Sequence, residues 1–555
     1  MFLWQPLPGA FYAPCVDGDY DQGVIGHEFG HMIENRMIGK GNTRSGFHAG
    51  SMGEAFGDLV SVEYLRENGF TPTDGEDPFA TGAYATGNKE HGIRNYVMNY
   101  PRTGAFPTPS TYPHVNPLNF SDIGYDTPGN EVHSDGEIWV AVNNSVRQAL
   151  IDKYSGAFPA GDAKLQAKCA NGVLPSENCP GNRRWIQLVF DSMLLDPVAP
   201  TMVDARNSLL AADTMRYGGA NQKEIWDAFA KRGLGAAAAV HASTVNDTNP
   251  VPDFASPVAA NTQVTFDIRA KTPDSPAVVG NVYVGHYEKQ VVPIADTNPA
   301  TVNAGIDVNR DAVASFAPGE HEFLVVAKGY GAYRFSAKLQ GAARTLTVEM
   351  PVNWASSAQG ATASGDGTTP GAAIDEAEGT NWSADGRAAD GTLSGIFGKQ
   401  ITIDLAGADA RDIRHVQVSA MIAVAIPPAP AQSRFAALRS FELWACNAAL
   451  GANCSTDAGY TKVYTSATNA FPGDAPRPIG PQLILRDFEV PKFTATHLRL
   501  RVLTNQCTGG PAYQGEQDLD PAATTDCDTG VSAASERRFV RTAEIQAFSS
   551  DPTKD

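Results

Sequence analysis

The sequence predicts a multidomain protein in which a mainly α-helical domain precedes two all-β sandwich domains. Its 555 residues correspond to about three to four domains of ordinary size. Segments with helical periodicity are confined to residues 1–243, and short runs with a period of two, typical of strands, dominate from residue 258 onward. Stretches rich in Gly, Pro, Ser, Asn and Asp lie near the boundaries and indicate linkers.

The helical domain is predicted to comprise residues 1–243. Its expected helices are Asp21–Met37, Ser51–Leu65, Gly136–Ile151, Trp185–Leu194, Val203–Ala212 and Gln222–Lys231. Gly233 follows the last helix, where glycine is favoured because it adopts left-handed backbone angles without strain. Residues 244–257 are dense in Pro, Asn and Asp, so we expect a linker there.

Two β-rich regions follow this linker. In residues 258–350, runs such as VTFDI, HEFLVVA and TLTVEM alternate apolar and polar positions between turn residues, which predicts an immunoglobulin-like sandwich. Residues 352–549 contain the low-complexity stretch SSAQGATASGDGTTPG near their start and further alternating runs after it. These runs predict a second all-β sandwich.

The charge balance and hydropathy exclude two kinds of partner. The chain has 42 Lys and Arg against 61 Asp and Glu, a formal net charge of −19. No nucleic acid partner is expected, because phosphate binding requires clustered basic side chains. No apolar run approaches the ~18 residues of a membrane-spanning helix, so no transmembrane segment is predicted. The start of the sequence lacks the features of a signal peptide, and we expect the chain to be a fragment.

Six of the seven cysteines fall into close pairs that flank loop-like stretches. The predicted disulfides are Cys169–Cys179, Cys446–Cys454 and Cys507–Cys527. Loops closed by disulfides are typical of secreted proteins, whereas the alternative is reduced thiols in a cytosolic protein. Cys15 is left over, and its partner is expected in upstream sequence. The pattern favours an extracellular location.

The segment GVIGHEFGHMIENRM contains the motif His27-Glu28-x-x-His31. Residues four apart in a helix are offset by only about 40°, so both imidazoles project from one face and can bind one Zn²⁺. Glu28 lies beside this pair, close enough to approach a water at the metal. The alternative, a surface helix with two incidental histidines, is less expected in a chain with only 11 histidines.

The second predicted helix, SMGEAFGDLVSVEYL, supplies carboxylates. A catalytic zinc site needs three protein ligands and one open position, and Glu54 is the predicted third ligand. Asp58 lies one turn further on and is placed to accept the free N–H of a zinc-bound imidazole. Two alternatives stay open. Ser51-x-x-Glu54 matches a capping box, in which Glu54 only caps its own helix, and Asp58 can be a solvated carboxylate.

These motifs resemble the fungalysin family of metallopeptidases, within the thermolysin-like gluzincins. The similar stretches, in the family's order, are DGDYDQGVIGHEFGHMIENRMIG, GSMGEAFGDLVSVEYL, NEVHSDGEIWVAV, PTMVDARNSLLAAD and IWDAFAKRGLG. The resemblance implies a thermolysin-like peptidase domain in which His27, His31 and Glu54 bind zinc. It also implies that Glu28 is the general base and that Asp58 orients a zinc ligand.

The resemblance implies two further site residues. His133, in the sequence Glu131-Val132-His133, would stabilise the oxyanion of the transition state, and Arg94, in GIRNY, would bind the substrate carbonyl. A lone histidine before a helix is more often structural, and a lone arginine is more often solvated. The sequence departs from the family at its start, because only 26 residues precede His27. We therefore expect the family's propeptide and most of the β-rich subdomain that binds the substrate backbone to lie outside this fragment.

The predicted reaction is hydrolysis of peptide bonds by a zinc-activated water, with Glu28 transferring the proton to the leaving amine. Gluzincin aminopeptidases are a neighbouring class, but the partial match MIEN overlaps the zinc helix and lacks the glycine of their Gly-x-Met-Glu-Asn segment. A metzincin is excluded because His31 is not followed by x-x-G-x-x-H.

The last region resembles the discoidin, or coagulation-factor type C, β-sandwich domains. The resemblance rests on ATASGDG, AIDEAEGTNWSADG, ITIDLAG and VRTAEIQAF, with Asp375, Thr380 and Trp382 matching a feature of the family. It implies a carbohydrate or surface ligand and a Ca²⁺ ion in addition to the catalytic Zn²⁺. Trp382 is more often a core aromatic than a ligand contact, so no binding residues are assigned.

Together these features predict a secreted zinc endopeptidase that acts on extracellular proteins. The two β-sandwich domains are expected to tether it to a surface or polymeric substrate. The alternative is a non-catalytic secreted adhesion or binding protein whose peptidase-like domain is vestigial. The presence of Glu28 together with all three zinc ligands favours the enzyme.

Overall fold

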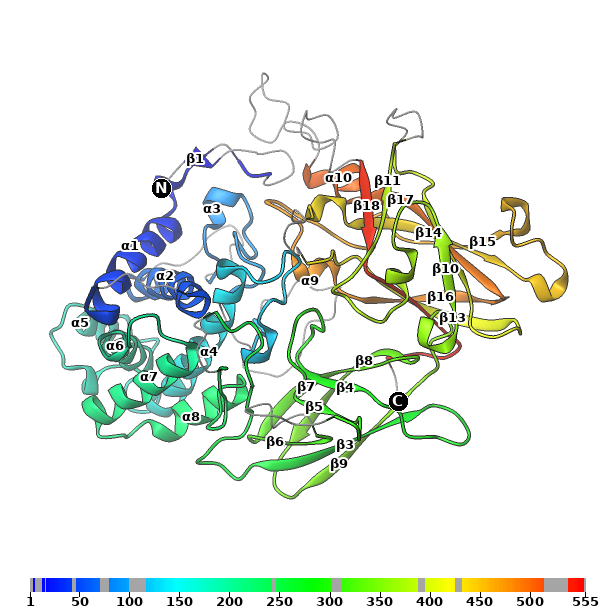
Figure 1. Cartoon of the computed structure of the whole chain (residues 1–555). Helices are drawn as coiled ribbons and strands as arrows, with labels where there is room; N and C mark the ends of the chain where they lie inside the picture. Colours follow the sequence, from blue (N-terminus) through cyan, green and yellow to red (C-terminus); the bar gives the residue numbers. More distant parts are fainter. Residues whose placement is uncertain are drawn as a thin grey trace.

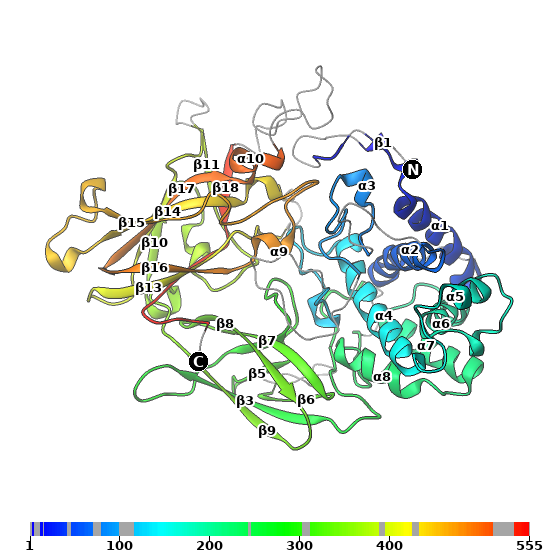
Figure 2. The ribbon, with the colours of Figure 1, turned by 180° about the vertical axis from the view of Figure 1, so that it is seen from behind.

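A computed structural model places a helical region beside two β-rich regions (Figure 1; Figure 2). It describes residues 3–4, 12–14, 16–41, 46–69, 79–98, 116–241, 246–301, 311–387, 395–424, 432–513 and 538–553. The helices of residues 22–231 gather at one side of the molecule, and the β-rich regions form the opposite side, one above the other in Figure 1. The predicted division into a helical part and a β-sheet-rich part is confirmed.

The helical region follows the predicted order of helices. Its described α-helices are α1 (Gln22–Met37), α2 (Phe47–Glu67), α3 (Ala83–Thr86), α4 (Val132–Tyr154), α5 (Ala163–Ala170), α6 (Gly181–Leu195), α7 (Met202–Tyr217) and α8 (Gln222–Lys231). Short 3₁₀ turns are η1 (Gly18–Tyr20), η2 (Ile38–Gly41), η3 (Phe120–Asp122) and η4 (Ser176–Asn178). Helices α2 and α4 begin before the predicted Ser51 and Gly136, at Phe47 and Val132. Their N-cap residues are Gly46 and Glu131.

Helix α4 occupies the centre of this region. It packs against α2, α6 and α8, and Trp139 is fully buried with its ring stacked on that of Phe229 at a centroid distance of 6.3 Å. Trp185 of α6 is also buried. The first turn of α4 carries His133, so this central helix fixes one wall of the candidate site.

The middle region consists of two packed sheets. Its strands are β3 (Thr262–Ala270), β4 (Asn281–Val284), β5 (Ala295–Asp296), β6 (Val313–Phe316), β7 (Gly319–Ala327), β8 (Gly331–Leu339) and β9 (Arg344–Met350). One sheet has the order β6-β3-β9, with β3 and β9 parallel, and the other has the order β5-β4-β7-β8. Phe266, Phe316 and Phe323 fill the space between them together with Phe254, which comes from the predicted linker.

The last region is also built from facing antiparallel sheets. Its strands are β10 (Thr362–Gly365), β11 (Trp382–Asp385), β12 (Gln400–Asp404), β13 (Arg411–Ser419), β14 (Leu438–Cys446), β15 (Thr461–Thr465), β16 (Arg486–Ala495), β17 (His497–Asn505), β18 (Phe539–Thr542) and β19 (Glu544–Phe548). The sheet β10-β12-β17-β14-β15 faces the sheet β16-β13-β19, and the rings of Phe441 and Phe488 meet between them at 5.1 Å. Strands β11 and β18 pair separately, and Trp382 is fully buried, as expected of a core aromatic.

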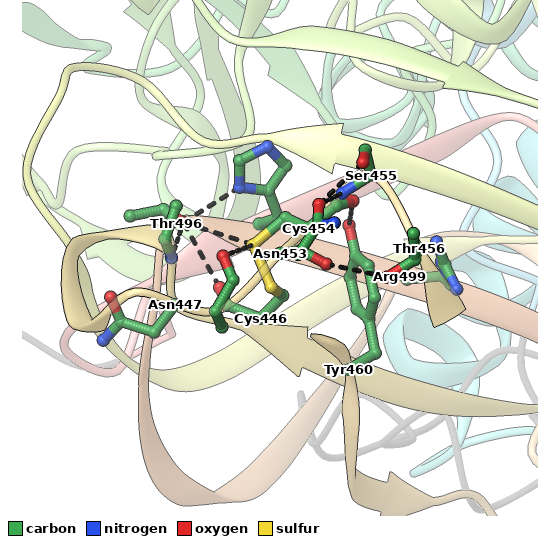
Figure 3. The surroundings of a disulfide bond; sticks show 12 residues. Cys446, Asn447, Asn453, Cys454, Ser455, Thr456, Tyr460, Thr496 and Arg499 are labelled. Carbon is green, nitrogen blue, oxygen red and sulfur yellow. Dashed lines mark hydrogen bonds between the residues drawn. A yellow bond between two sulfur atoms is a disulfide. The ribbon is translucent and has the colours of Figure 1, made fainter. Parts of the chain in front are cut away.

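Two of the predicted disulfides are present. Cys169–Cys179 joins α5 to the residue after η4, and Cys446–Cys454 joins the end of β14 to the following loop. Around the second bridge, the Tyr460 hydroxyl donates to the Cys454 carbonyl at 3.1 Å, and the Arg499 guanidinium stacks over the Tyr460 ring (Figure 3). The predictions for Cys15 and Cys527 fall outside the described residues.

Candidate metal centre

Helices α1 and α2 approach unusually closely because glycine occupies their contact surface. A Cβ atom on Gly26 would lie 2.9 Å from the Cα of Ser61, and one on Gly30 would lie 2.7 Å from the Cα of Gly57. A Cβ on Gly57 would lie 2.6 Å from Nδ1 of His27. Since real Cβ atoms do not approach this closely, any larger residue would push the helices apart and separate the groups between them.

The close approach brings His27, His31 and Glu54 together. Nε2 of His27 lies 3.3 Å from Oε2 of Glu54, and Nε2 of His31 lies 3.5 Å from Oε1 of the same carboxylate. The two imidazole rings are 4.6 Å apart, edge to face. One donor atom from each residue lies within 4.8 Å of the others, which is the spacing of three ligands around one metal ion. We call these three residues the His-His-Glu centre.

The capping alternative for Glu54 is wrong. Helix α2 begins at Phe47, so Ser51 lies inside the helix and its hydroxyl donates to the Phe47 carbonyl at 2.9 Å. The Glu54 carboxylate instead faces the two imidazoles from α1. The competing hypothesis for Asp58, a solvated carboxylate, is also wrong, since its side chain is only 2% exposed.

Asp58 holds the far side of His27. Its Oδ1 lies 2.8 Å from Nδ1 of His27, and Arg94 donates to both of its oxygens, at 2.7 and 3.0 Å. Burial alone would raise the pKa of Asp58, but the Arg94 guanidinium and the bond to His27 hold this pKa well below its ordinary value. A permanently ionised Asp58 fixes the His27 ring with Nε2 turned to the centre.

The charges around the centre favour a cation. Burial opposes the charged form of His27, but hydrogen bonds to Asp58 and Glu54 raise its pKa to about 9. Burial likewise opposes ionisation of Glu54, but His27 and Arg94 lower its pKa to about 2. In the absence of metal, a proton on His27 therefore compensates the carboxylates. A divalent ion would bring the same sign of charge to the same place.

Glu34 plays the corresponding part for His31, a role that was not predicted from the sequence. It lies fully buried on α1, and its Oε1 is 3.1 Å from Nδ1 of His31. The signal was available, because a carboxylate three residues after a histidine lies on the same helical face. Both imidazoles are thus fixed by a buried carboxylate on the side away from the centre.

The structure places His133 at the rim of the centre. Its Nε2 lies 3.4 Å from Oε2 of Glu54, and its Nδ1 lies 2.6 Å from Oε1 of Glu131. Glu131 also caps α4 by accepting from the backbone N–H of His133 and Ser134. The side chain of His133 is 52% exposed, so it can contact a bound molecule. Glu131 is a second residue whose contribution was not predicted from the sequence.

Arg94 is buried, whereas Glu28 is exposed. The Arg94 guanidinium is buried, and its N–H groups donate to the carboxylates of Asp58 and, at 3.4 Å, of Glu54. Its predicted contact with substrate stays a prediction. Glu28 follows His27 directly on α1, and its side chain is exposed. The predicted role of Glu28 as a base also stays a prediction.

The arrangement defines a class of site: a His-His-Glu metal centre on two helices, with each imidazole fixed by a buried carboxylate. Residues 1–238 match the model of the fungalysin metallopeptidase family (M36). This part of the chain is similar to that family, and the resemblance predicted from its motifs is confirmed.

Curated relatives of the chain carry the name extracellular metalloproteinase. The chain is 34% identical over 242 residues to the protein mep of Aspergillus fumigatus, a match that covers 43% of this chain and 33% of the relative. It is 34% identical over 260 residues to mep of Aspergillus flavus, covering 46% and 36%, respectively. It is 33% identical over 244 residues to extracellular metalloproteinase 4 of Arthroderma gypseum, covering 43% and 34%. The matched part spans about a third of each relative.

Solved structures similar to the chain include two modules of carbohydrate-active enzymes. One is CBM32 of AlyQ in complex with 4,5-unsaturated mannuronic acid, with 17% identity, a TM-score of 0.19, and coverage of 34% of this chain and 94% of the module. Another is chitosan-binding module 1 of a Paenibacillus sp. IK-5 chitosanase/glucanase, with 15% identity, a TM-score of 0.20, and coverage of 35% and 98%. No helix among the described residues is long and apolar enough to cross a membrane.

Proposed function

We propose that the chain is a zinc-dependent endopeptidase that hydrolyses peptide bonds of extracellular proteins. The convergence of His27, His31 and Glu54 carries this proposal. It occurs in the part of the chain that matches the fungalysin metallopeptidases. Because that part covers only about a third of the curated relatives, the activity is proposed from the site and not transferred from them.

The donors fit Zn²⁺. Two imidazole nitrogens and one carboxylate oxygen are the protein ligands of many catalytic zinc sites, which keep a further position open. Asp58 and Glu34 hold the two imidazoles from behind, an arrangement that strengthens imidazoles as metal ligands. Zinc bound there would polarise the substrate carbonyl and make water a stronger acid.

The remaining steps are proton transfer and stabilisation of negative charge by the protein. We propose that Glu28 accepts a proton from the attacking water and returns it to the leaving amine. Glu131 accepts from Nδ1 of His133, which turns Nε2 towards the centre. In its protonated form, this ring donates from Nε2 to the oxyanion that develops on the substrate.

Secretion and the partners belong to the same proposal. The relatives are named extracellular, and disulfides such as Cys169–Cys179 persist in oxidising compartments. Protein substrates follow from the proposed activity. A carbohydrate or surface ligand of the last region and an additional Ca²⁺ stay predictions from the sequence.

The alternative is a secreted binding protein with an inactive peptidase-like region. Zinc analysis of the full chain, together with casein hydrolysis with and without o-phenanthroline, separates the two. We expect about one zinc per chain, and we expect hydrolysis to stop with the chelator. His31→Gln should lose both zinc and activity, whereas the control His497→Gln, a histidine of β17, should keep both. A chain without zinc, or hydrolysis that survives chelation, would refute the proposal.

A further inference from the structure

The segment between η3 and α4 is held by all three regions of the molecule. Residues 124–131, here called the Asp126 turn, lead directly into the helix that carries His133. The Asp126 side chain at its centre is fully buried. A buried carboxylate requires strong partners, because transfer of a charge out of water is costly unless the charge is paired.

The main partner of Asp126 comes from the last region. Arg434, at the start of η7 (Arg434–Ala436), donates to both oxygens of Asp126, at 2.9 and 2.6 Å. It also donates to the Pro478 carbonyl at 3.3 Å, within its own region. The two-point geometry fixes the direction of the carboxylate as well as its position. The Arg434 guanidinium also holds the pKa of Asp126 well below its ordinary value, although burial alone would raise it.

From Asp126 the chain of contacts continues to α4. The Ser134 hydroxyl donates to Oδ2 of Asp126 at 2.6 Å, and the Asn95 amide donates to the same oxygen at 3.1 Å. Ser134 is the neighbour of His133, and the backbone N–H groups of both residues donate to the Glu131 carboxylate, which caps the helix. The orientation of the first turn of α4 is therefore connected to Arg434 through one carboxylate.

The other two regions add contacts on both sides. Lys289, in the middle region, donates from Nζ to the backbone carbonyls of Asp126, at 3.0 Å, and of Thr127. In the last region, the Ala475 carbonyl accepts from the Asn88 amide at 2.8 Å. Oδ1 of Asp474 lies 3.4 Å from Nε2 of His91, whose Nδ1 is 2.5 Å from the Arg94 carbonyl. The segment that carries Arg94 is thus held by the last region too.

We propose that Arg434 is a positioning residue of the candidate active site, and that the last β-rich region is a structural part of this site. Through Asp126 and Ser134, Arg434 fixes the first turn of α4, so that His133 faces the His-His-Glu centre. This inference rests on the proposed function for its kinetic consequences, although the structural connection is independent of it. It differs from the sequence-based expectation of a domain that only tethers the enzyme.

The test is a set of full-length variants. Arg434→Met removes both donors, and Arg434→Lys keeps the charge but not the two-point contact. Arg499→Met removes another buried arginine of the last region, which pairs with Asp457 at 2.7 Å, and serves as the control. Zinc content, melting temperature, amide hydrogen exchange, and kcat and KM on a short peptide are measured for each. The set separates loss of positioning from loss of folding.

We expect Arg434→Met to lower kcat about 10- to 100-fold, because a displaced catalytic group has effects of this size. KM and zinc content should change little, and amide exchange at residues 126–136 should become faster. Arg434→Lys should recover part of the rate, and Arg499→Met should resemble the parent. If Arg434→Met does not fold, Arg434→Lys provides the same comparison, with a smaller loss.

A double-mutant cycle with His133→Ala makes the test specific. If Arg434 acts through His133, Arg434→Met should have little further effect on kcat once His133 is absent. Equal losses of kcat in both backgrounds, or unchanged amide exchange at residues 126–136, would overturn the inference. A parent chain without zinc-dependent hydrolysis would refute the proposed function, while the exchange measurement would still decide whether Arg434 holds the turn.

Discussion

The His-His-Glu centre and the Asp126 turn are assembled in opposite ways. The centre draws its donors from two helices that are close in sequence, with His27 and Glu54 separated by only 27 positions. At the turn, Asp126 and Arg434 are 308 positions apart and belong to different regions. The side chains proposed to bind the metal are therefore close together in sequence. The ion pair proposed to orient His133, in contrast, forms only when all regions of the chain are folded.

The two sites also differ in the balance of charge. Around the centre, the buried carboxylates of Asp58 and Glu34 lie behind imidazoles, and His27 gains a proton when no metal compensates them. Around the turn, several cations already converge on Asp126, and burial together with Arg434 lowers the pKa of Lys289 to about 7, although Asp126 acts to raise it. At the first site a cation would compensate the buried carboxylates, whereas at the second site basic side chains already compensate Asp126.

The largest expected effect is the loss of the proposed base at the centre. Glu28→Gln keeps the size of the side chain but cannot accept a proton at neutral pH. We expect kcat for casein or peptide hydrolysis to fall by about 10²- to 10⁴-fold, the range typical of general acid–base catalysis. Since Glu28 is not among the three proposed ligands, zinc content should stay at the level of the parent.

The control for this change is Glu177→Gln, which neutralises an exposed carboxylate on η4. It should leave both kcat and zinc content unchanged. A Glu28→Gln variant that cleaves as fast as the parent would show that another group accepts the proton.

The sequence was sufficient for the centre but not for what surrounds it. The spacings within HExxH and between Glu54 and Asp58 predict shared helical faces, and the structure has these faces. It was not possible to predict Arg434 as the partner of Asp126, because no local pattern relates residues so far apart in sequence. Helix α2 begins earlier than predicted for a physical reason. Ser51 has the spacing of a cap, but its hydroxyl donates a hydrogen bond to the Phe47 carbonyl inside the helix.

A smaller effect is expected from the carboxylates behind the imidazoles. Asp58→Asn and Glu34→Gln should each weaken zinc binding about 10- to 100-fold, the usual consequence of losing such a partner. Asp58→Asn should have the larger effect, because it also leaves Arg94 without the carboxylate that accepts two of its bonds. Competition with a fluorescent zinc chelator measures both affinities.

Asp213→Asn is the matched control for these two variants. Asp213 is a fully buried carboxylate of the same region, but it accepts from Asn221 and Gln222, away from the centre. The Asp213→Asn variant should have a lower melting temperature than the parent but the same zinc affinity when folded. If all three variants bound zinc equally well, the two carboxylates would have no part in holding the ligands.

The smallest effect concerns the pH dependence of stability at the Asp126 turn. The pKa of Lys289 is about 7 in the folded chain and 10.5 in its ordinary state. Between these values the unfolded chain binds a proton that the folded chain releases, so the contribution of Lys289 to stability increases with pH and is lost as pH falls towards 7. Relative to Lys289→Met, the free energy of unfolding of the parent should rise by about 1.4 kcal/mol per pH unit between pH 7.5 and 9.

Urea denaturation at several pH values measures this difference, and Lys223→Met gives the comparison. Lys223 is exposed, and its bond to Asp227 raises its pKa, so both chain states keep its proton throughout this pH range. Its difference from the parent should therefore be independent of pH. A flat difference for Lys289→Met as well would mean that Lys289 stays protonated in the fold. In that case the carbonyls of Asp126 and Thr127 would stabilise the ammonium as well as water does, and the turn would tolerate another full charge beside Arg434.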